Sequence, residues 1–466
     1  MNVTSNEFLF EAAPIAAIAV PGIPALLVPL IGVHPFTRRP SELFAGRLTL
    51  VGLWLSFLAS IVLAFAWSNG AHRPLAIDFV EIRISSDHGF QVALLVDALS
   101  LAMMLVTSTI ALLVARFSIR YLHREPGFQR YFISLNVFVA GMQLLVLAGT
   151  YDLLLVGWEL VGLSSILLIA YFRHRPGPVR GGLRAMVTYR VTDVGLLFAA
   201  VVVHHAAETP RFVSFLGSDP WPPTGASLGS GVATVVAALL LVSVAGKSAL
   251  FPLGGWLPRA MEGPTPSSAL FYGALSVHAG VYLLLRSASL FVASTTASIA
   301  AFVIGLASAL LATAAGRVQS DAKNRLAFAT MAQVGLMVAA VGLHLWWWVV
   351  VHMVAHVCLR LYQLLRAPSA LRDAQEMRAA LAELPPARPS LAYRMLPEEA
   401  RTYLYHLALQ RFHMDELVDA LVVVPVMRAA HAVIGLDDRF RRLFASAPAS
   451  TETRVGREES ESVVRS

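Results

Sequence analysis

Ionisable residues occur inside stretches that are otherwise apolar, and they indicate the chemistry of which this chain is capable. Lys247 lies toward the end of an apolar run that begins near Gly231, and Glu159 lies within YDLLLVGWELVGLSSILLIAY. A charge at the centre of a membrane helix costs about 2.5–3.5 kcal/mol, so such residues usually face a partner or water. A nearby cation keeps a buried carboxylate ionised. The pattern predicts an ion-handling site in which Glu159 is the titrating partner of Lys247.

Pro252 follows Lys247 after five residues and predicts a helix break. Proline cannot donate a backbone hydrogen bond, so the helix should break or kink there. A broken helix at membrane depth is tolerated only where protein or a water-filled cavity lines it. The alternative interpretation is an ordinary helix end with the Lys247 ammonium snorkelling to the membrane surface.

A second charged pair, Arg190 and Asp193, lies in the apolar stretch VTYRVTDVGLLFAA. Their i,i+3 spacing places both side chains on one face of a helix. The pair is either a structural salt bridge or part of the same ion-handling site.

Two histidines and an arginine share one face of a later apolar helix. His352, His356 and Arg360 follow each other at i, i+4 and i+8 in VHMVAHVCLRLY. Histidine titrates near neutral pH and is suited to a proton relay. The spacing also fits a metal site, but no third ligand is evident in the sequence. A pair of hydrogen-bonded core histidines is the remaining alternative.

Further polar groups lie near these residues. Tyr272, Ser276 and His278 add polar side chains to the span before Arg286. Lys323 lies beside Asp321, just ahead of a later span, where either snorkelling or a relay role fits.

Composition predicts an all-α polytopic membrane protein. The 466 residues are 57% hydrophobic and 14% charged, and the mean hydropathy is +0.66. The single cysteine excludes an intrachain disulfide or Fe–S cluster. Neither a Walker A motif nor GxGxxG occurs, so we expect neither ATP hydrolysis nor a bound cofactor. About eleven spans are predicted, near 13–33, 45–67, 92–114, 131–149, 152–172, 183–205, 231–252, 267–286, 293–315, 325–343 and 345–366.

The loops between these spans predict the orientation. Arginines and lysines are concentrated in alternate loops, after the first, third, fifth and ninth spans, and the intervening loops are poor in them. By the positive-inside rule the rich loops are cytoplasmic, the N-terminus is outside and the C-terminus is cytoplasmic. The formal charge of +7 therefore reflects membrane orientation, and we expect no nucleic-acid partner.

The composition divides the chain into three parts. Residues 1–366 form the predicted ion-translocating membrane domain, 367–446 a cytoplasmic or interfacial docking region, and 447–466 a polar tail predicted to be disordered. Within the second part, 417–436 is apolar but carries charged residues. An amphipathic interfacial helix is favoured there over a twelfth span.

These stretches together resemble the antiporter-like subunits of respiratory complex I and of Mrp antiporters, the fifth-type NADH dehydrogenase subunit above all. The resemblance rests on GWE, on GKSALFPLGGWLPRAMEGPTP, on DAKNRLAFATMAQVGLM and on the H-x3-H stretch, in the family's order. It implies an ion-translocating role for Glu159, Lys247, Asp193, His352 and His356, the residues that occupy the family's positions.

The chain also departs from that pattern. Tyr272 stands where the family usually has histidine, with His278 six residues later, and Arg360 stands where lysine is usual. The family folds as two inverted five-helix repeats, whereas this chain turns polar after the eleventh predicted span. The resemblance therefore implies an antiporter-like fold with a truncated second repeat.

The shortened pattern, with QLLRAPSAL after the histidines, resembles the membrane subunit of DAB-type inorganic carbon transporters. This implies a bacterial inner-membrane subunit without a cofactor of its own. Its partner would be a large cytoplasmic zinc protein related to β-carbonic anhydrases, energised by cation flow, most simply of protons. The alternatives are a proton-translocating subunit of a complex I-like or Mrp-type assembly, and a non-conducting membrane anchor.

Overall fold

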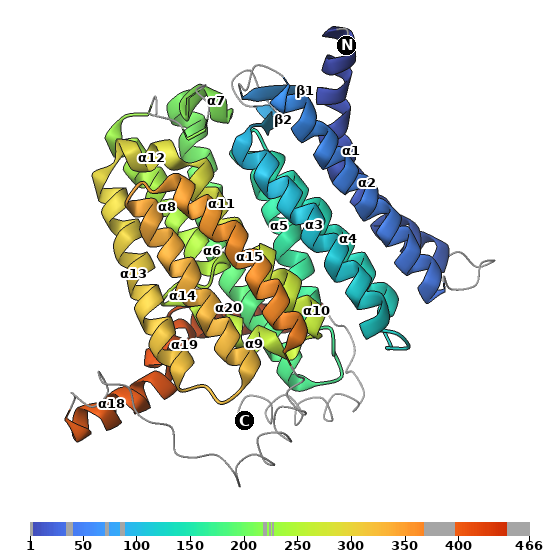
Figure 1. The fold of residues 1–466 in the computed structure, drawn as a ribbon. Coiled ribbons are helices and arrows are strands. Elements are labelled where there is room, and N and C mark those ends of the chain that lie inside the picture. The colour runs from blue at the N-terminus through green and yellow to red at the C-terminus, as the bar shows by residue number, and fades with distance from the viewer. Residues whose placement is uncertain are drawn as a thin grey trace. The chain divides into compact units, whose positions relative to one another are not determined.

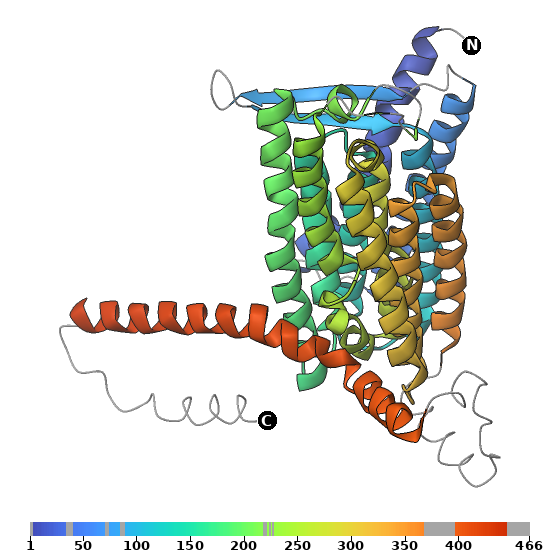
Figure 2. The same cartoon turned by 90° about the vertical axis from the view of Figure 1, so that its left-hand side faces the viewer.

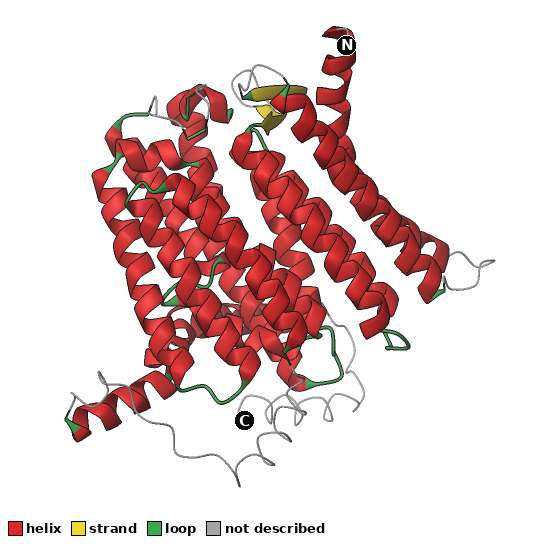
Figure 3. Cartoon of the chain, viewed as in Figure 1, coloured by secondary structure: helices red, strands yellow, loops and turns green. Residues whose placement is uncertain are grey.

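Long apolar helices make up most of the protein in the computed structural model (Figure 1, Figure 3). The structure describes residues 3–33, 41–69, 74–83, 89–217, 221–222, 225, 228–367 and 397–444. The predicted tail at 447–466 and all of 368–396 lie outside these described residues. The all-α polytopic class predicted from composition is confirmed.

Twelve helices in the described part of the chain are long and apolar enough to cross a membrane. Eleven correspond to the predicted spans, and the additional candidate is Arg411–Asp437, which contains the apolar segment at 417–436. The interfacial placement of that segment stays a prediction. The first eleven comprise α1 (Val3–Val33), α2 (Glu42–Ser68), α3 (Ala98–Tyr121), α4 (Phe128–Leu147), α5 (Tyr151–Ile169), α6 (Pro176–Ala207), α8 (Ser230–Lys247), the stretch Thr265–Arg286, α13 (Thr295–Arg317), α14 (Ala322–Gly342) and α15 (Trp346–Arg366).

A two-stranded antiparallel hairpin precedes α3 and moves the start of the third span. Strands β1 (Leu75–Arg83) and β2 (Gly89–Val96) pair from Leu75 opposite Val96, and Figure 2 shows them lying across one end of the helical bundle. Helix α3 begins only after Asp97, whose side chain accepts from the Ser100 amide in a capping box. The predicted start at residue 92 was therefore wrong, because residues 92–96 belong to β2.

The most buried part of the bundle is the stretch Thr265–Arg286, all of whose residues are buried. It consists of α10 (Thr265–Ser267), the π-helix η3 (Ser268–Leu275) and α11 (Ser276–Arg286), and α12 (Ala288–Ala293) follows. Between α8 and this stretch the chain forms three single turns: η1 (Leu253–Gly255), α9 (Trp256–Arg259) and η2 (Ala260–Glu262). A further short helix, α7 (Phe212–Phe215), follows α6.

Helices α13 and α14 approach closely because glycines face each other along their contact. A Cβ at Gly305 would lie 2.3 Å from the amide nitrogen of Ala339, and one at Gly335 would lie 2.7 Å from that of Ala309. Small residues permit such backbone contact in membrane helix pairs.

The chain divides after Val418 into two compact units. The first unit ends with α18 (Glu398–Leu409), η4 (Arg411–His413) and α19 (Met414–Val418). The second contains the π-helical turn η5 (Asp419–Val423) and α20 (Val424–Phe444). The functional boundary predicted at residue 366, between the membrane domain and the docking region, is not this division and stays a prediction.

Candidate ion-translocation site

Lys247 is the last residue of α8 and is fully buried. Its Nζ donates to the main-chain carbonyl of Trp158 at 2.9 Å and lies 4.9 Å and 4.6 Å from the ring centroids of Trp158 and Tyr189. Aromatic faces attract a cation through their quadrupoles. The predicted alternative of an ammonium that snorkels to the surface is therefore wrong, because Lys247 points into the bundle.

The helix ends at Lys247 because the following residues leave the helical conformation. Ala249 has a φ of 54°, and Pro252 lacks an amide hydrogen. The indole of Trp256 donates to the Gly246 carbonyl at 2.9 Å, which satisfies one of the carbonyls left free at the helix end. The break predicted from Pro252 is present, and it starts four residues earlier, directly after Lys247.

Carboxylates lie close to Lys247 without contacting it. The Trp158 indole donates to Asp193 Oδ1 at 2.6 Å, so one tryptophan contacts both the lysine and the aspartate. Arg190 donates to Asp193 Oδ2 at 3.4 Å and forms an ion pair with Glu159. Lys247 interacts electrostatically with Asp193, Glu159 and Arg190. The structure therefore places Glu159 against Arg190, and the predicted partnership of Glu159 with Lys247 is electrostatic and indirect.

Glycine at position 162 leaves room for the lysine head group. A Cβ there would lie 2.9 Å from Lys247 Nζ and 3.7 Å from Tyr189 Cδ2. Gly162 belongs to α5, which also carries Trp158 and Glu159. Sequence reasoning missed this residue, since a glycine in an apolar helix gives no indication of what approaches it.

A second polar cluster joins α11 to α15. His278 Nε2 and His356 Nδ1 are hydrogen-bonded at 2.9 Å, and Arg360 Nε donates to His356 Nε2 at 3.0 Å. All three side chains are buried. His352 bonds to Gln333 at 2.9 Å instead, with its ring centroid 6.2 Å from that of His356. The structure therefore unites three of the predicted relay residues and leaves His352 beside them.

The arginine fixes the direction of this hydrogen-bond chain. A guanidinium only donates, so His356 Nε2 is the acceptor and the proton of a neutral ring is on Nδ1. That proton is donated to His278 Nε2, which leaves the His278 proton on Nδ1. His278 Nδ1 is buried and has no hydrogen-bond partner of ordinary geometry among the described residues.

Tyr189 and Ser276 lie between the two clusters. The Tyr189 ring contacts Lys247, its hydroxyl interacts with the Ser276 side chain, and Ser276 is two residues from His278. Tyr189 Oη and Ser276 Oγ are both buried without a well-formed hydrogen bond within the described residues. Tyr272, predicted as an additional polar group of this helix, donates to the Ser165 carbonyl at 2.8 Å and thus joins α5 to η3.

Lys323 is buried in the first turn of α14, beside the N-cap residue Asp321. Its electrostatic partner is Asp321, and the structure gives it no contact with the histidine cluster. No group of three or more His, Cys, Asp or Glu suited to a metal ion occurs in the described ranges.

Two ion-pair sites were not predicted. Asp97 and Arg286 form a buried pair at 2.5 Å that joins the start of α3 to the end of α11. Asp415 in α19 pairs with Arg184 at 3.2 Å, Arg259 at 3.0 Å and Arg411 at 3.3 Å. The second cluster fastens α19 to α6 and α9, next to Gly255 in the turn η1 that follows the break after α8.

Comparison with known proteins identifies the family. The model described as "NADH:quinone oxidoreductase/Mrp antiporter, TM" matches residues 148–396, and "NADH-Ubiquinone oxidoreductase (complex I), chain 5 N-terminus" matches 83–132. NADH-quinone oxidoreductase subunit L of Mycobacterium tuberculosis is 35% identical over 299 residues, which cover 64% of this chain and 46% of that protein.

Two further relatives extend the comparison. The "Probable inorganic carbon transporter subunit DabB1" of Halothiobacillus neapolitanus is 35% identical over 287 residues, 61% of this chain and 51% of that one. The Mrp complex from a Dietzia species is similar in structure, with a TM-score of 0.62 and 25% identity over 83% of this chain and 40% of that one. The chain spans about half the length of the curated relatives it matches. It is a polytopic membrane protein of the NADH:quinone oxidoreductase/Mrp antiporter family.

Proposed function

We propose that this chain is a proton-conducting membrane subunit. The observation that carries the proposal is the environment of Lys247: a fully buried ammonium, held by a carbonyl and two aromatic rings, at the end of a broken helix. Buried lysines change protonation readily when neighbouring charges change. Asp193, Glu159 and Arg190 are the neighbours whose charges act on it.

The proposed route leads from Lys247 past Tyr189 and Ser276 to His278, and then to His356 and Arg360. Buried polar atoms that lack a well-formed protein hydrogen bond are sites at which water can bridge, and within the described residues Tyr189 Oη, Ser276 Oγ and His278 Nδ1 are such atoms. Water between Ser276 and His278 would complete a hydrogen-bonded path between the two clusters. Within the path, the ring of His356 transfers a proton by accepting at one nitrogen and donating at the other.

Proton flux into proteoliposomes that contain a pH-sensitive dye tests this function. We expect Lys247→Met to abolish dye acidification driven by an imposed potential, and the wild-type chain to conduct. Lys323→Met is the matched control, because it removes a buried lysine that contacts neither cluster. Equal flux for wild type, Lys247→Met and empty vesicles would instead support the non-conducting anchor.

We propose further that the conducted ion energises a cytoplasmic partner for inorganic carbon accumulation. The relative named as a probable inorganic carbon transporter subunit supports this assignment. The partner would be a large zinc protein related to β-carbonic anhydrases, the membrane a bacterial inner membrane, and this chain a coupling subunit without a cofactor of its own. The orientation follows from the arginine-rich loops, with the N-terminus outside and the C-terminus cytoplasmic.

The second candidate is a subunit of a complex I-like or Mrp-type assembly, which the structural similarity to an Mrp complex favours. Purification from the native membrane in mild detergent separates the two. Co-elution of a zinc-containing protein that hydrates CO2 supports the carbon transporter. Co-elution of several other polytopic subunits, with no zinc protein, supports the antiporter-type assembly.

A further inference from the structure

Two apolar grooves flank α3 on its outer surface, and both reach the same arginine. The larger, about 820 Å³, lies between α3 and α15 and is lined by apolar side chains such as Ile110, Phe117 and Leu361. The smaller, about 190 Å³, lies between α2 and α3 and includes Trp54. Thr109, Leu113 and Arg116 line both grooves, so α3 forms the ridge between them.

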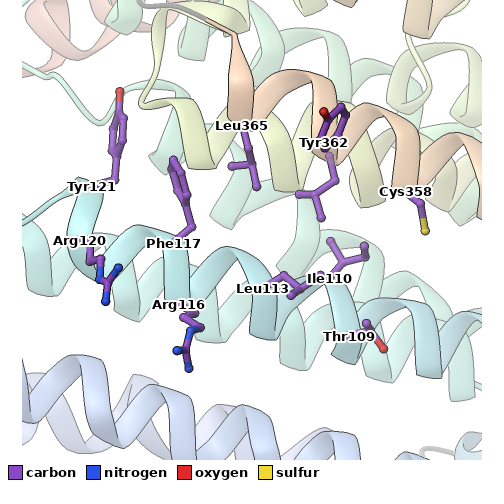
Figure 4. Close-up of a pocket in the computed structure, with 11 residues that line it drawn as sticks. Thr109, Ile110, Leu113, Arg116, Phe117, Arg120, Tyr121, Cys358, Tyr362 and Leu365 are labelled. Carbon is purple, nitrogen blue, oxygen red and sulfur yellow. The ribbon is translucent and has the colours of Figure 1, made fainter.

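Two cations stand at one end of this ridge. Arg116 and Arg120 lie on the last two turns of α3, one helical turn apart, and both are exposed. Figure 4 shows Phe117 projecting toward α15, whereas Arg116 and Arg120 project from the other side of α3. Among the described residues neither arginine has an ion-pair or hydrogen-bond partner, in contrast to Arg184, Arg259 and Arg286.

The depth of the arginines fits a membrane surface. Arg116 lies five residues before the end of α3, about 7–8 Å along the axis, and a long arginine side chain extends that distance toward water. On α15, across the larger groove, Arg366 donates to the hydroxyl of Tyr362, a residue that lines the groove. This end of the grooves is therefore cationic, while the remainder is apolar.

We propose that the two grooves and the arginine pair bind one anionic glycerophospholipid. Its phosphate would lie on Arg116 and Arg120, and its two acyl chains would occupy the grooves on either side of Leu113. Basic pockets between membrane helices bind anionic head groups in this manner. The two apolar grooves converge on one cationic end, at Arg116. This matches a phospholipid, in which two acyl chains are attached to one anionic head group. A single partner helix would fill one groove only and would have to supply carboxylates at the same depth.

Photo-crosslinking with diazirine-bearing phospholipids tests the proposal on the purified full chain in nanodiscs. We expect a phosphatidylglycerol probe to label peptides from α3 and α15 about tenfold more than the matched phosphatidylcholine probe, since each arginine near the surface favours anionic lipid. Arg116→Gln with Arg120→Gln should remove that preference, and replacement of both by lysine should retain most of it.

Two controls separate this site from general attraction to the membrane. Arg173→Gln with Arg175→Gln removes two exposed arginines from another loop and should leave the preference unchanged. Thr109 lines both grooves, so Thr109→Trp adds bulk to each without a change in charge and should reduce labelling near Cys358, which lines the larger groove. Equal labelling by the two probes, labelling that survives the loss of both arginines, or crosslinks from the groove to a co-purified polypeptide would each overturn the proposal.

Discussion

His278 and His356 lie 78 residues apart in the sequence and are joined by a buried hydrogen bond of 2.9 Å. One ring comes from α11 and the other from α15, the last of the eleven predicted spans. Arg360 fixes the direction of this hydrogen bond. Because it donates to Nε2 of His356, the His356 proton is on Nδ1 and is donated to His278. A second proton can bind to His356 Nε2 only if Arg360 moves away. The positive charge of Arg360 therefore opposes protonation of the histidine that would relay the proton.

Replacement of His356 by alanine should therefore reduce proton flux by about 100-fold or more, the range lost when a positioned proton-transfer group is removed. His278→Ala should have a similar effect, and the double variant should be no worse than either alone, since the two act in series. The measurement is dye acidification in proteoliposomes at matched protein density.

His205→Ala is the control for this pair, because His205 is exposed and bonds to the Val201 carbonyl of its own helix, away from the His278–His356 cluster. Its flux should equal that of the wild type. Full conduction by the His278, His356 double variant would show that these histidines serve packing alone.

Gly162→Ala should disturb Lys247 with little loss of stability. The new methyl group would lie 2.9 Å from Nζ, too close for an unshifted ammonium, but the end of a lysine side chain moves easily. We expect a reduced proton flux with a thermal midpoint close to that of the wild type. Leu163→Ala alters the adjacent residue, whose side chain is 53% exposed, and should leave flux unchanged. An unaltered flux in Gly162→Ala would mean that the lysine position is not critical.

Much of this arrangement follows from the sequence, and the missing parts have physical reasons. Hydrophobic runs of membrane length predicted the spans, and Pro252 predicted the break, because both signals are local. The intervention of Trp158 between Lys247 and Asp193 was not predictable, since a tryptophan in an apolar helix is unremarkable until a lysine from another helix reaches its carbonyl. For the same reason Glu159 was assigned to Lys247 when its ion-pair partner is Arg190.

Arg286 should matter for stability and not for conduction. Its buried pair with Asp97 joins α3 to α11, and Tyr282 accepts a further hydrogen bond from it at 2.8 Å. Loss of one member of a buried pair costs about 3–5 kcal/mol, because the other charge is left without a partner. Arg286→Met should therefore lower the thermal midpoint in detergent, and addition of Asp97→Asn should recover part of the loss. A reduced flux per folded molecule, at a temperature where the variant is intact, would contradict a purely structural role.

The side of the membrane reached by the C-terminus can be measured with paired fusions. Green fluorescent protein fluoresces inside the cytoplasm, and alkaline phosphatase is active outside it. Fusions after Leu409 and after Ser466 bracket the apolar helix Arg411–Asp437. We expect both positions to report the cytoplasm, in agreement with the arginine-rich loops. Opposite reports from the two positions would show that the helix crosses the membrane.

Asp415 should hold the start of the C-terminal region against the membrane domain. Its carboxylate pairs with three arginines from α6, α9 and η4, and the flanking Met414 and Val418 are buried. Asp415→Asn leaves those cations without their counter-charge. Hydrogen bonds to charged groups contribute about 1.5–3 kcal/mol, so amide exchange in residues 411–418 should accelerate by about 10- to 100-fold.

Gly255→Ala provides an independent variant of the same contact. A Cβ there would lie 2.0 Å from Asp415 Oδ1 and would displace the carboxylate without changing any charge. It should produce the same acceleration of exchange in 411–418. Glu416→Gln is the control, since its side chain is 72% exposed and pairs with His413 at the surface. If this segment also carries the docking site for a cytoplasmic partner, both Asp415→Asn and Gly255→Ala should release that partner at lower salt than the wild type. Exchange rates unchanged in both variants would show that Met414 and Val418 alone hold α19 in place.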